Sequence, residues 1–174
     1  MKRQQGSSLL LVLIVLGVML AGALAAVRST DTASQIAGNA AFRSAARQSA
    51  DVGASAAFAY LTANAAVDTS VPNLYYPIRG TDDAAGLPAI AWGSVAATTV
   101  GNNTVQWVVE RMCRGALPVT DLQGQCLVDV QTAAGSNKIG ADAFSTPANV
   151  FYRITIRVRG PKNTESFAQT LVSR

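Results

Sequence analysis

The sequence predicts an α+β fold in which a long N-terminal helix packs on an antiparallel sheet of about four strands. Three features carry this prediction. Residues 7–27 form an apolar run without a charged side chain, residues 28–64 continue it as an alanine-rich segment, and residues 104–174 hold runs of alternating apolar and polar side chains. A sheet with one apolar face needs a cover, and the alanine-rich helix is the large apolar surface available for it.

The apolar run at residues 7–27 has the length of a membrane span. At about 1.5 Å per residue, a helix of this length extends roughly 30 Å, the thickness of the hydrocarbon core of a bilayer. A short basic leader, residues 1–6, precedes the run, and Arg28 follows it. Gly17 and Gly22 lie inside it, where they either allow close approach of another helix or are simply tolerated in a membrane helix.

The amphipathic half of the helix, residues 28–64, is expected to bury one stripe of side chains and to expose another. Arg43, Arg47 and Asp51 follow a spacing of four and form the expected exposed stripe. The expected buried stripe, at spacings of three and four, consists of Phe42, Ala45, Ser49, Val52, Ala56 and Ala59 or Tyr60.

The helical pattern ends near residue 65, and proline and glycine punctuate residues 65–103. We interpret this region as a connecting segment, with Tyr75, Tyr76 and Trp92 as its anchors into the core. Strands are predicted at residues 104–112, 127–131, 150–159 and 164–172, with a four-residue turn at 160–163.

The composition argues against an enzyme. The chain contains no histidine, which removes the commonest general base and the commonest metal ligand. It also lacks a C-x-x-C, a G-x-G-x-x-G and a phosphate-binding loop. Asp82 and Asp83 could ligate Ca²⁺, but an acidic pair in a loop is usually only solvated. We therefore expect no catalytic residues, no cofactor and no metal site.

Two further groups of residues have alternative interpretations. Cys113 and Cys126 are expected to form a disulfide if the chain reaches an oxidising compartment, and are otherwise buried free thiols. Arg153, Arg157 and Arg159 share one strand face. They form either an exposed basic contact face for DNA or acidic lipid, or ion pairs with glutamates of neighbouring strands, Glu110 or Glu165. The net charge of +4 does not favour a nucleic-acid partner.

The N-terminus resembles that of the minor pilins of type IV pili. The leader Lys2-Arg3-Gln4-Gln5-Gly6, followed by Ser7-Ser8-Leu9-Leu10-Leu11, is similar to the PilX type, whose leader is also rich in arginine and glutamine and ends in glycine. The resemblance implies a ladle-shaped subunit. Prepilin peptidase would cleave between Gly6 and Ser7, and the new N-terminal amine would be methylated.

The resemblance also implies where the protein acts and with what. The subunit would sit in the inner membrane as a single-pass protein with a periplasmic head, and later at the cell surface in the pilus. Its partners would be major and other minor pilins, prepilin peptidase, membrane lipid before assembly, and a tip adhesin as a further candidate. The helix that mediates assembly would present Leu9, Leu10, Leu11, Val12, Leu13, Ile14, Gly17 and Gly22.

Two positions depart from the pattern of major pilins. Most major pilins carry phenylalanine where this chain has Ser7, and glutamate where it has Leu11. In the family, subunits without this acid are found among the PilX-type and tip-like proteins. The resemblance therefore points to a minor subunit that contributes to assembly, initiation or surface properties of a pilus.

Three alternatives stay open at this point. A signal peptide could be removed after about Ala25, at Ala23-Leu24-Ala25, releasing a secreted globular binding or enzymatic domain. The apolar run could be a plain single-span anchor for a binding domain. The chain could also be a pseudopilin of a type II secretion system.

Overall fold

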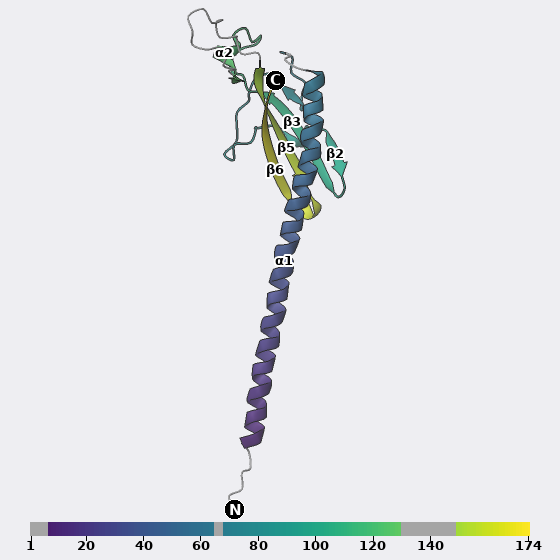
Figure 1. Cartoon of the computed structure of the whole chain (residues 1–174), viewed down its shortest axis with the longest axis vertical. Helices are drawn as coiled ribbons and strands as arrows, with labels where there is room; N and C mark the ends of the chain where they lie inside the picture. The colour runs from purple at the N-terminus through teal and green to yellow at the C-terminus, as the bar shows by residue number, and fades with distance from the viewer. Residues whose placement is uncertain (1–6, 65–67, 130–148) are drawn as a thin grey trace, which may run out of the picture. The chain divides into compact units, whose positions relative to one another are not determined.

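A computed structural model describes residues 7–64, 68–129 and 149–174. These fall into two units, one ending at Ser44 and the other spanning Ala45–Arg174. The elements, labelled in Figure 1 where space allows, are α1 (Ser7–Ala63), β1 (Tyr75–Tyr76), the 3₁₀ turn η1 (Trp92–Ser94), β2 (Ala97–Val100), β3 (Asn103–Arg111), α2 (Leu122–Gln125), β4 (Val128–Asp129), β5 (Asn149–Arg159), the 3₁₀ turn η2 (Pro161–Asn163) and β6 (Glu165–Ser173). The long N-terminal helix and the α+β layout are as predicted.

The second unit contains a mixed sheet of six strands in the described part of the chain. Its central pair is β3 and β5; β6 and β4 pair with β5, and β1 and β2 pair with β3. All pairs are antiparallel except β1 with β3. The prediction of a purely antiparallel sheet of about four strands was therefore wrong in two respects. The sheet has two more strands, β1 and β2, and β1 runs parallel to β3. The two additional strands come from residues 65–103 and are only two and four residues long, too short to leave a clear alternation.

The apolar alternation of the longest strand is confirmed. In β5, Val150, Tyr152, Ile154, Ile156 and Val158 point to one face, and each is at most 5% exposed. The strands predicted at residues 104–112 and 164–172 match β3 and β6 to within about one residue. Of the strand predicted at residues 127–131, the structure contains Val128–Asp129 as β4, and the rest of that prediction lies partly outside the described residues.

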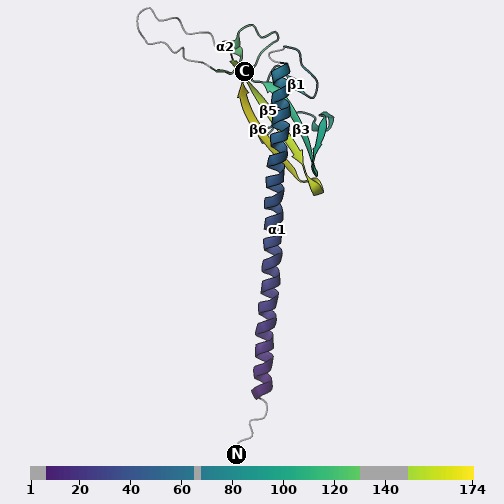
Figure 2. The same ribbon diagram turned by 45° about the vertical axis from the view of Figure 1, so that its right-hand side comes forward.

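The C-terminal part of α1 lies across this apolar face of the sheet (Figures 1 and 2). The predicted buried stripe of the helix was displaced by about one residue. Of that stripe, Ser49 is buried and Phe42 and Tyr60 are half-buried, whereas Ala45, Val52, Ala56 and Ala59 are exposed. The helix instead buries Ala46, Ser49, Ala50, Gly53, Ala57 and Leu61. The exposed stripe of Arg43, Arg47 and Asp51 is confirmed.

Gly53 explains the displaced stripe. A Cβ atom at this position would lie 2.8 Å from Cγ1 of Val105 on β3 and 3.0 Å from Cγ2 of Ile156 on β5. The helix backbone thus approaches the central strand pair more closely than any side chain would allow. The sequence pattern favoured the larger Val52 for the core. However, the closest helix–sheet contact requires the residue without a side chain, and Val52 is 49% exposed.

The opposite face of the sheet is also covered, by the segment that precedes β2. Gln106 of β3 donates through Nε2 to the carbonyls of Trp92 and Val95, both at 2.8 Å. The Trp92 ring packs edge-on against Phe167 of β6 at 5.6 Å between centroids. The segment predicted as a connection therefore serves as a third layer, and β3 is buried on both of its faces.

Two of the three predicted aromatic anchors lie in β1. Tyr75 is fully buried and its ring lies 6.4 Å from that of Tyr60, which confirms it as an anchor. Tyr76 and Trp92 are half-buried. Tyr60 also contacts Trp107 at 5.8 Å between centroids, so the end of α1 is held by an aromatic cluster.

We expect Gly53→Val to destabilise the second unit by roughly 1–3 kcal/mol, the typical cost of overpacking a well-filled core. Ala56→Val is the matched control, because it places the same side chain on the exposed side of the same helix, where helix propensity alone costs about 0.5 kcal/mol. The measurement is a urea titration of the full chain in detergent, followed by the fluorescence of Trp92 and Trp107. Equal midpoints for the two variants would contradict the close contact at Gly53.

Candidate functional site

The apolar half of α1 is a continuous exposed surface. Within the first unit, the large apolar side chains from Leu9 to Leu24 are between 44 and 69% exposed. In the described part of the chain, α1 is the one helix long and apolar enough, by length and composition, to cross a membrane. Such a surface is unfavourable in water, because burying apolar area yields about 25 cal/mol per Å². Residues 8–27 therefore require lipid, a detergent or other helices around them.

The residues predicted to mediate assembly lie on this surface. Leu9, Leu10, Leu11, Val12, Leu13 and Ile14 are all exposed. Apart from their chain neighbours and the backbone of their own helix, Gly17 and Gly22 have no described atom within 4 Å of the position that a Cβ would occupy, so both can admit a neighbouring helix. Of the predicted cleavage pair, Ser7 is the first described residue of α1, and Gly6 lies outside the described residues.

The predicted disulfide between Cys113 and Cys126 is present. It links the residues after β3 to those before β4, and the backbone of the two cysteines also forms an isolated bridge. The loop between them contains α2, whose first turn is capped by the Asp121 carboxylate at 3.1 and 3.0 Å from the amides of Gln123 and Gly124. A hollow of about 470 Å³ adjoins the disulfide, lined among others by Arg79 and Arg114. The disulfide thus holds a surface loop to the edge of the sheet.

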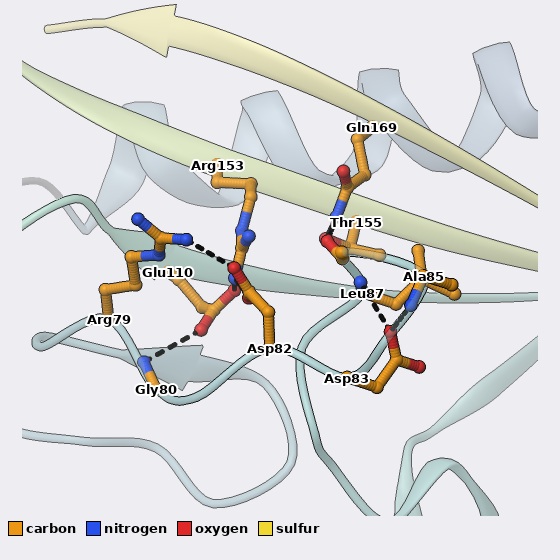
Figure 3. Close-up of polar contacts among 11 residues, drawn as sticks. Arg79, Gly80, Asp82, Asp83, Ala85, Leu87, Glu110, Arg153, Thr155 and Gln169 are labelled. Atoms are coloured by element: carbon orange, nitrogen blue, oxygen red, sulfur yellow. Dashed lines mark hydrogen bonds and ion pairs between the residues drawn. The ribbon is translucent and has the colours of Figure 1, made fainter.

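A partly buried charge cluster lies on the sheet face opposite α1, and we call Arg79, Asp82, Glu110 and Arg153 the charge cluster (Figure 3). Arg153 of β5 is 6% exposed and Glu110 of β3 is 1% exposed. Arg153 donates to Oε2 of Glu110 from Nε at 2.9 Å and from Nη2 at 2.6 Å. Nη2 also contacts Oδ1 of Asp82 at 2.6 Å.

The remaining acceptors of the charge cluster are also occupied. Oε1 of Glu110 accepts from the amide of Gly80 at 3.1 Å, and Oδ2 of Asp82 pairs with Arg79. Two guanidiniums and two carboxylates therefore neutralise each other, which makes the burial of Arg153 and Glu110 tolerable. The cluster fastens the segment around residues 79–82 to the two central strands.

The electrostatics of the charge cluster favour the ionised states of Asp82 and Arg153. Hydrogen bonds from Arg153 and then Arg79 lower the pKa of Asp82 from 3.8 to about 2. Burial by itself would lower the pKa of Arg153, but its hydrogen bonds with Asp82 and Glu110 outweigh burial and raise that pKa. Both shifts follow from ion pairing in a partly dehydrated site.

The alternative in which the arginines pair across strands is confirmed, and the exposed basic contact face was wrong for two of its three members. Arg153 is buried in the charge cluster. Arg157 pairs with Glu165, contacts Gln106 at 3.2 Å and stacks 6.0 Å from the centre of the Trp92 ring. Arg159, with 46% of its side chain exposed, lies 3.5 Å from Glu165. The strand register places each glutamate opposite its arginine, as Glu110 with Arg153 and Glu165 with Arg159.

The acidic pair Asp82-Asp83 is engaged in structural contacts rather than open to a cation. Asp83 accepts from the amides of Ala85 and Leu87 through Oδ1, at 2.8 and 2.9 Å. In the part of the chain that the structure describes, no group of three or more acidic or cysteine side chains is placed to hold a metal ion. Asp82 thus acts as a structural counter-ion.

One buried ion pair was missed by the sequence interpretation. Arg111, the last residue of β3, is 3% exposed and its Nη2 lies 2.9 Å from Oδ1 of Asp68. Arg111 also donates from Nε to the sulfur of Cys113 at 3.1 Å. Asp68 follows the end of α1 in a segment without regular pattern, so no sequence signal connects it with Arg111.

Comparisons of the chain with protein-family models, curated proteins and solved structures give no match.

We expect the charge cluster to show strong coupling between Arg153 and Glu110. Arg153→Met leaves the buried Glu110 carboxylate without its guanidinium and should cost about 3–5 kcal/mol of unfolding free energy. The double variant Arg153→Met/Glu110→Gln should be more stable than Arg153→Met alone, because it removes the unpaired charge. Urea titrations at pH 7 of the parent protein, Arg153→Met, Glu110→Gln and the double variant give a double-mutant cycle. If the stability losses of the two single variants simply add in the double variant, the pairing is contradicted.

Acid should lower the stability of the second unit, Ala45–Arg174, which we call the head, through protonation of Asp82. Because its folded pKa is depressed to about 2 from a reference of 3.8, its stabilising contribution is present above pH 4 and is lost as the pH falls from about 4 to 2. Asp82→Asn should therefore be less stable at pH 6 and should lose less stability over that window. Urea midpoints at pH 6, 4 and 2.5 test this, with Asp51→Asn on the exposed helix face as a control that should follow the parent protein.

Proposed function

We propose that this protein is a minor pilin of a type IV pilus, with a structural rather than catalytic role. The single observation that supports it most is that α1 holds two different surfaces within one helix. Residues 8–27 are apolar and exposed, and residues 46–61 bury their small side chains on a β-sheet. A chain built in this way can be held in a membrane and can later pack the same helix against other subunits.

The helix composition suits transfer from lipid to a bundle of helices. No charged side chain occurs between Ser7 and Val27, so no side chain of this segment needs a counter-ion when the helix leaves the bilayer and enters a bundle. Gly17 and Gly22 leave open space at their Cα atoms, which lets helices pack closely through small residues.

The side chain at Leu11 supports a minor rather than a major subunit. In the resemblance, the glutamate that most major pilins carry here meets the N-terminal amine of a neighbour. Leu11 has no acceptor to offer and is 62% exposed. We infer that this subunit docks through apolar packing and does not depend on that ion pair, as expected for a subunit that initiates or decorates a fibre.

The head supports a role in contact rather than in chemistry. The arginines of its central strand β5 are engaged in the charge cluster and in cross-strand pairs, and its disulfide holds a surface loop. The localisation that we propose is the inner membrane with a periplasmic head before assembly, followed by the pilus at the cell surface. Formation of the disulfide in the periplasm is consistent with this route.

The mature N-terminus tests the proposal. We expect intact mass and N-terminal sequencing of the membrane fraction to give a chain that begins at Ser7 with a methylated amine, and Gly6→Arg to leave the leader attached. Ala25→Leu is the matched control, because a large residue there would block a signal peptidase but should not affect cleavage before Ser7.

A mature chain that begins near Ala26, and that accumulates uncleaved in Ala25→Leu, would overturn the proposal in favour of a secreted domain. The protein should also be recovered with sheared surface fibres, and its absence from fibres despite cleavage at Ser7 would contradict the pilus role.

A further inference from the structure

Strand β6 forms the longest edge of the sheet in the described part of the chain. Its nine residues pair with β5 alone, and Figures 1 and 2 show it as the outermost strand on that side of the sheet. The other side of the sheet ends in β1 and β2, which are two and four residues long. One edge is therefore split into short strands, whereas the other presents a long and regular backbone.

The hydrogen-bonding phase of β6 shows which of its backbone groups point away from β5. Val150 and Arg174 exchange both backbone hydrogen bonds, at 2.6 and 2.9 Å. Because bonded and non-bonded pairs alternate along an antiparallel ladder, the even-numbered residues of β6 bond to β5. The outward N–H and C=O groups therefore belong to Glu165, Phe167, Gln169, Leu171 and Ser173.

This edge lacks the features that usually protect exposed strands. Natural edges carry proline, lysine, a bulge or an inward-pointing charge. The pairing of β6 with β5 runs without a bulge from Glu165 to Ser173, and β6 contains neither proline nor lysine. Its only charged side chain, Glu165, is at its first residue and is already paired with Arg157 and Arg159. Among the described strands, none pairs with the outer side of β6.

A hollow beside the edge can hold a side chain of such a strand. It measures about 350 Å³ and is lined by Met112, Arg153, Gln169, Thr170 and Leu171. Leu171 is 53% exposed, and the charge of Arg153 is neutralised within the charge cluster. Since alternate side chains of a strand point to the same face, an apolar residue of an added strand would enter this hollow and set the register.

The charge at the start of the edge selects the sign of the partner. There, the two guanidiniums of Arg157 and Arg159 face the single carboxylate of Glu165, which leaves an excess of one positive charge. This excess favours a partner strand with a negative side chain at that end. At the other end, the guanidinium of Arg174 is engaged with the carbonyl of Leu61.

We propose that the β6 edge binds an extended segment of a partner protein, which joins the sheet as an additional strand with alternating apolar side chains and a net negative charge. This is strand addition, in which the backbone ladder supplies affinity and side-chain pockets supply specificity. The proposal concerns the head alone and does not rest on the pilus assignment.

The test uses the full chain in detergent and a synthetic nine-residue peptide that alternates valine with threonine and glutamate. We expect saturable binding, followed by fluorescence anisotropy of the labelled peptide, that weakens as salt is raised. The same peptide with N-methylated edge-facing amides should not bind. An uncharged version with glutamine for glutamate should bind more weakly and without the salt dependence.

A pair of variants at one position separates the backbone from the side chain. Leu171→Pro removes an outward N–H without removing a bond to β5, and it should weaken binding about tenfold or more. Leu171→Ala keeps that N–H and should weaken binding by a smaller factor. The urea midpoint of each variant reports whether the head is still folded.

The proposal is overturned if the N-methylated peptide binds as well as the parent peptide, or if no peptide binds because the edge is already covered. Dimers of the protein that exclude the peptide would also overturn it, in favour of a second copy. If Leu171→Pro fails to fold, the comparison of the two peptides on the unaltered protein still decides the outcome.

Discussion

The close contact between α1 and the β3–β5 pair at Gly53 is the constraint on which the head depends. Because a Cβ at Gly53 would lie within 3.0 Å of side-chain carbons of Val105 and Ile156, the helix backbone packs directly on these two side chains of the sheet. This contact sets which helix face is buried, and it places Ser49 within 2.9 Å of Asn103 and Tyr60 against Trp107. The aromatic cluster and the small-residue face are therefore consequences of one close approach.

The other face of the sheet is organised by charge rather than by apolar packing. The charge cluster and the contacts of Gln106 hold the segment before β2 onto β3 and β5, so that polar side chains of two strands act as attachment points. Buried ion pairs contribute little net stability, because dehydration offsets their attraction. Their effect here is one of specificity, since each carboxylate accepts from groups in a defined segment and a different placement would leave a charge unpaired.

The apolar half of α1 and the head serve different proposed roles. The apolar half of α1 provides a surface that must be covered by lipid or by helices, and the proposed assembly role depends on it. The head pairs the charges of its central strands internally, and among its described strands β6 presents the longest edge without a further partner. In these proposals, anchoring by α1 depends on apolar burial, and recognition by the β6 edge depends on backbone hydrogen bonds.

The sequence by itself determined the elements with strong periodicity. The uncharged run at residues 7–27 could only be an apolar helix of membrane length, and the alternation from Val150 to Val158 could only place five apolar side chains on one face. Such local patterns can be recognised in the sequence because they depend only on residues that lie close together along the chain. The disulfide and the pairing of the arginines with Glu110 and Glu165 were each one of two alternatives that the sequence left open, and the structure decided between them.

Only the tertiary structure decided which helix stripe is buried, how many strands the sheet has and where Asp82 and Asp68 find their partners. Gly53 decides which stripe is buried, because only a residue without a side chain fits this contact. A pattern of hydrophobic residues does not show where a missing side chain is required. The short strands β1 and β2 exist because β3 offers them a backbone to pair with. The acidic partners of Arg153 and Arg111 come from loops 71 and 43 residues away, and contacts over such distances are set by how the layers stack.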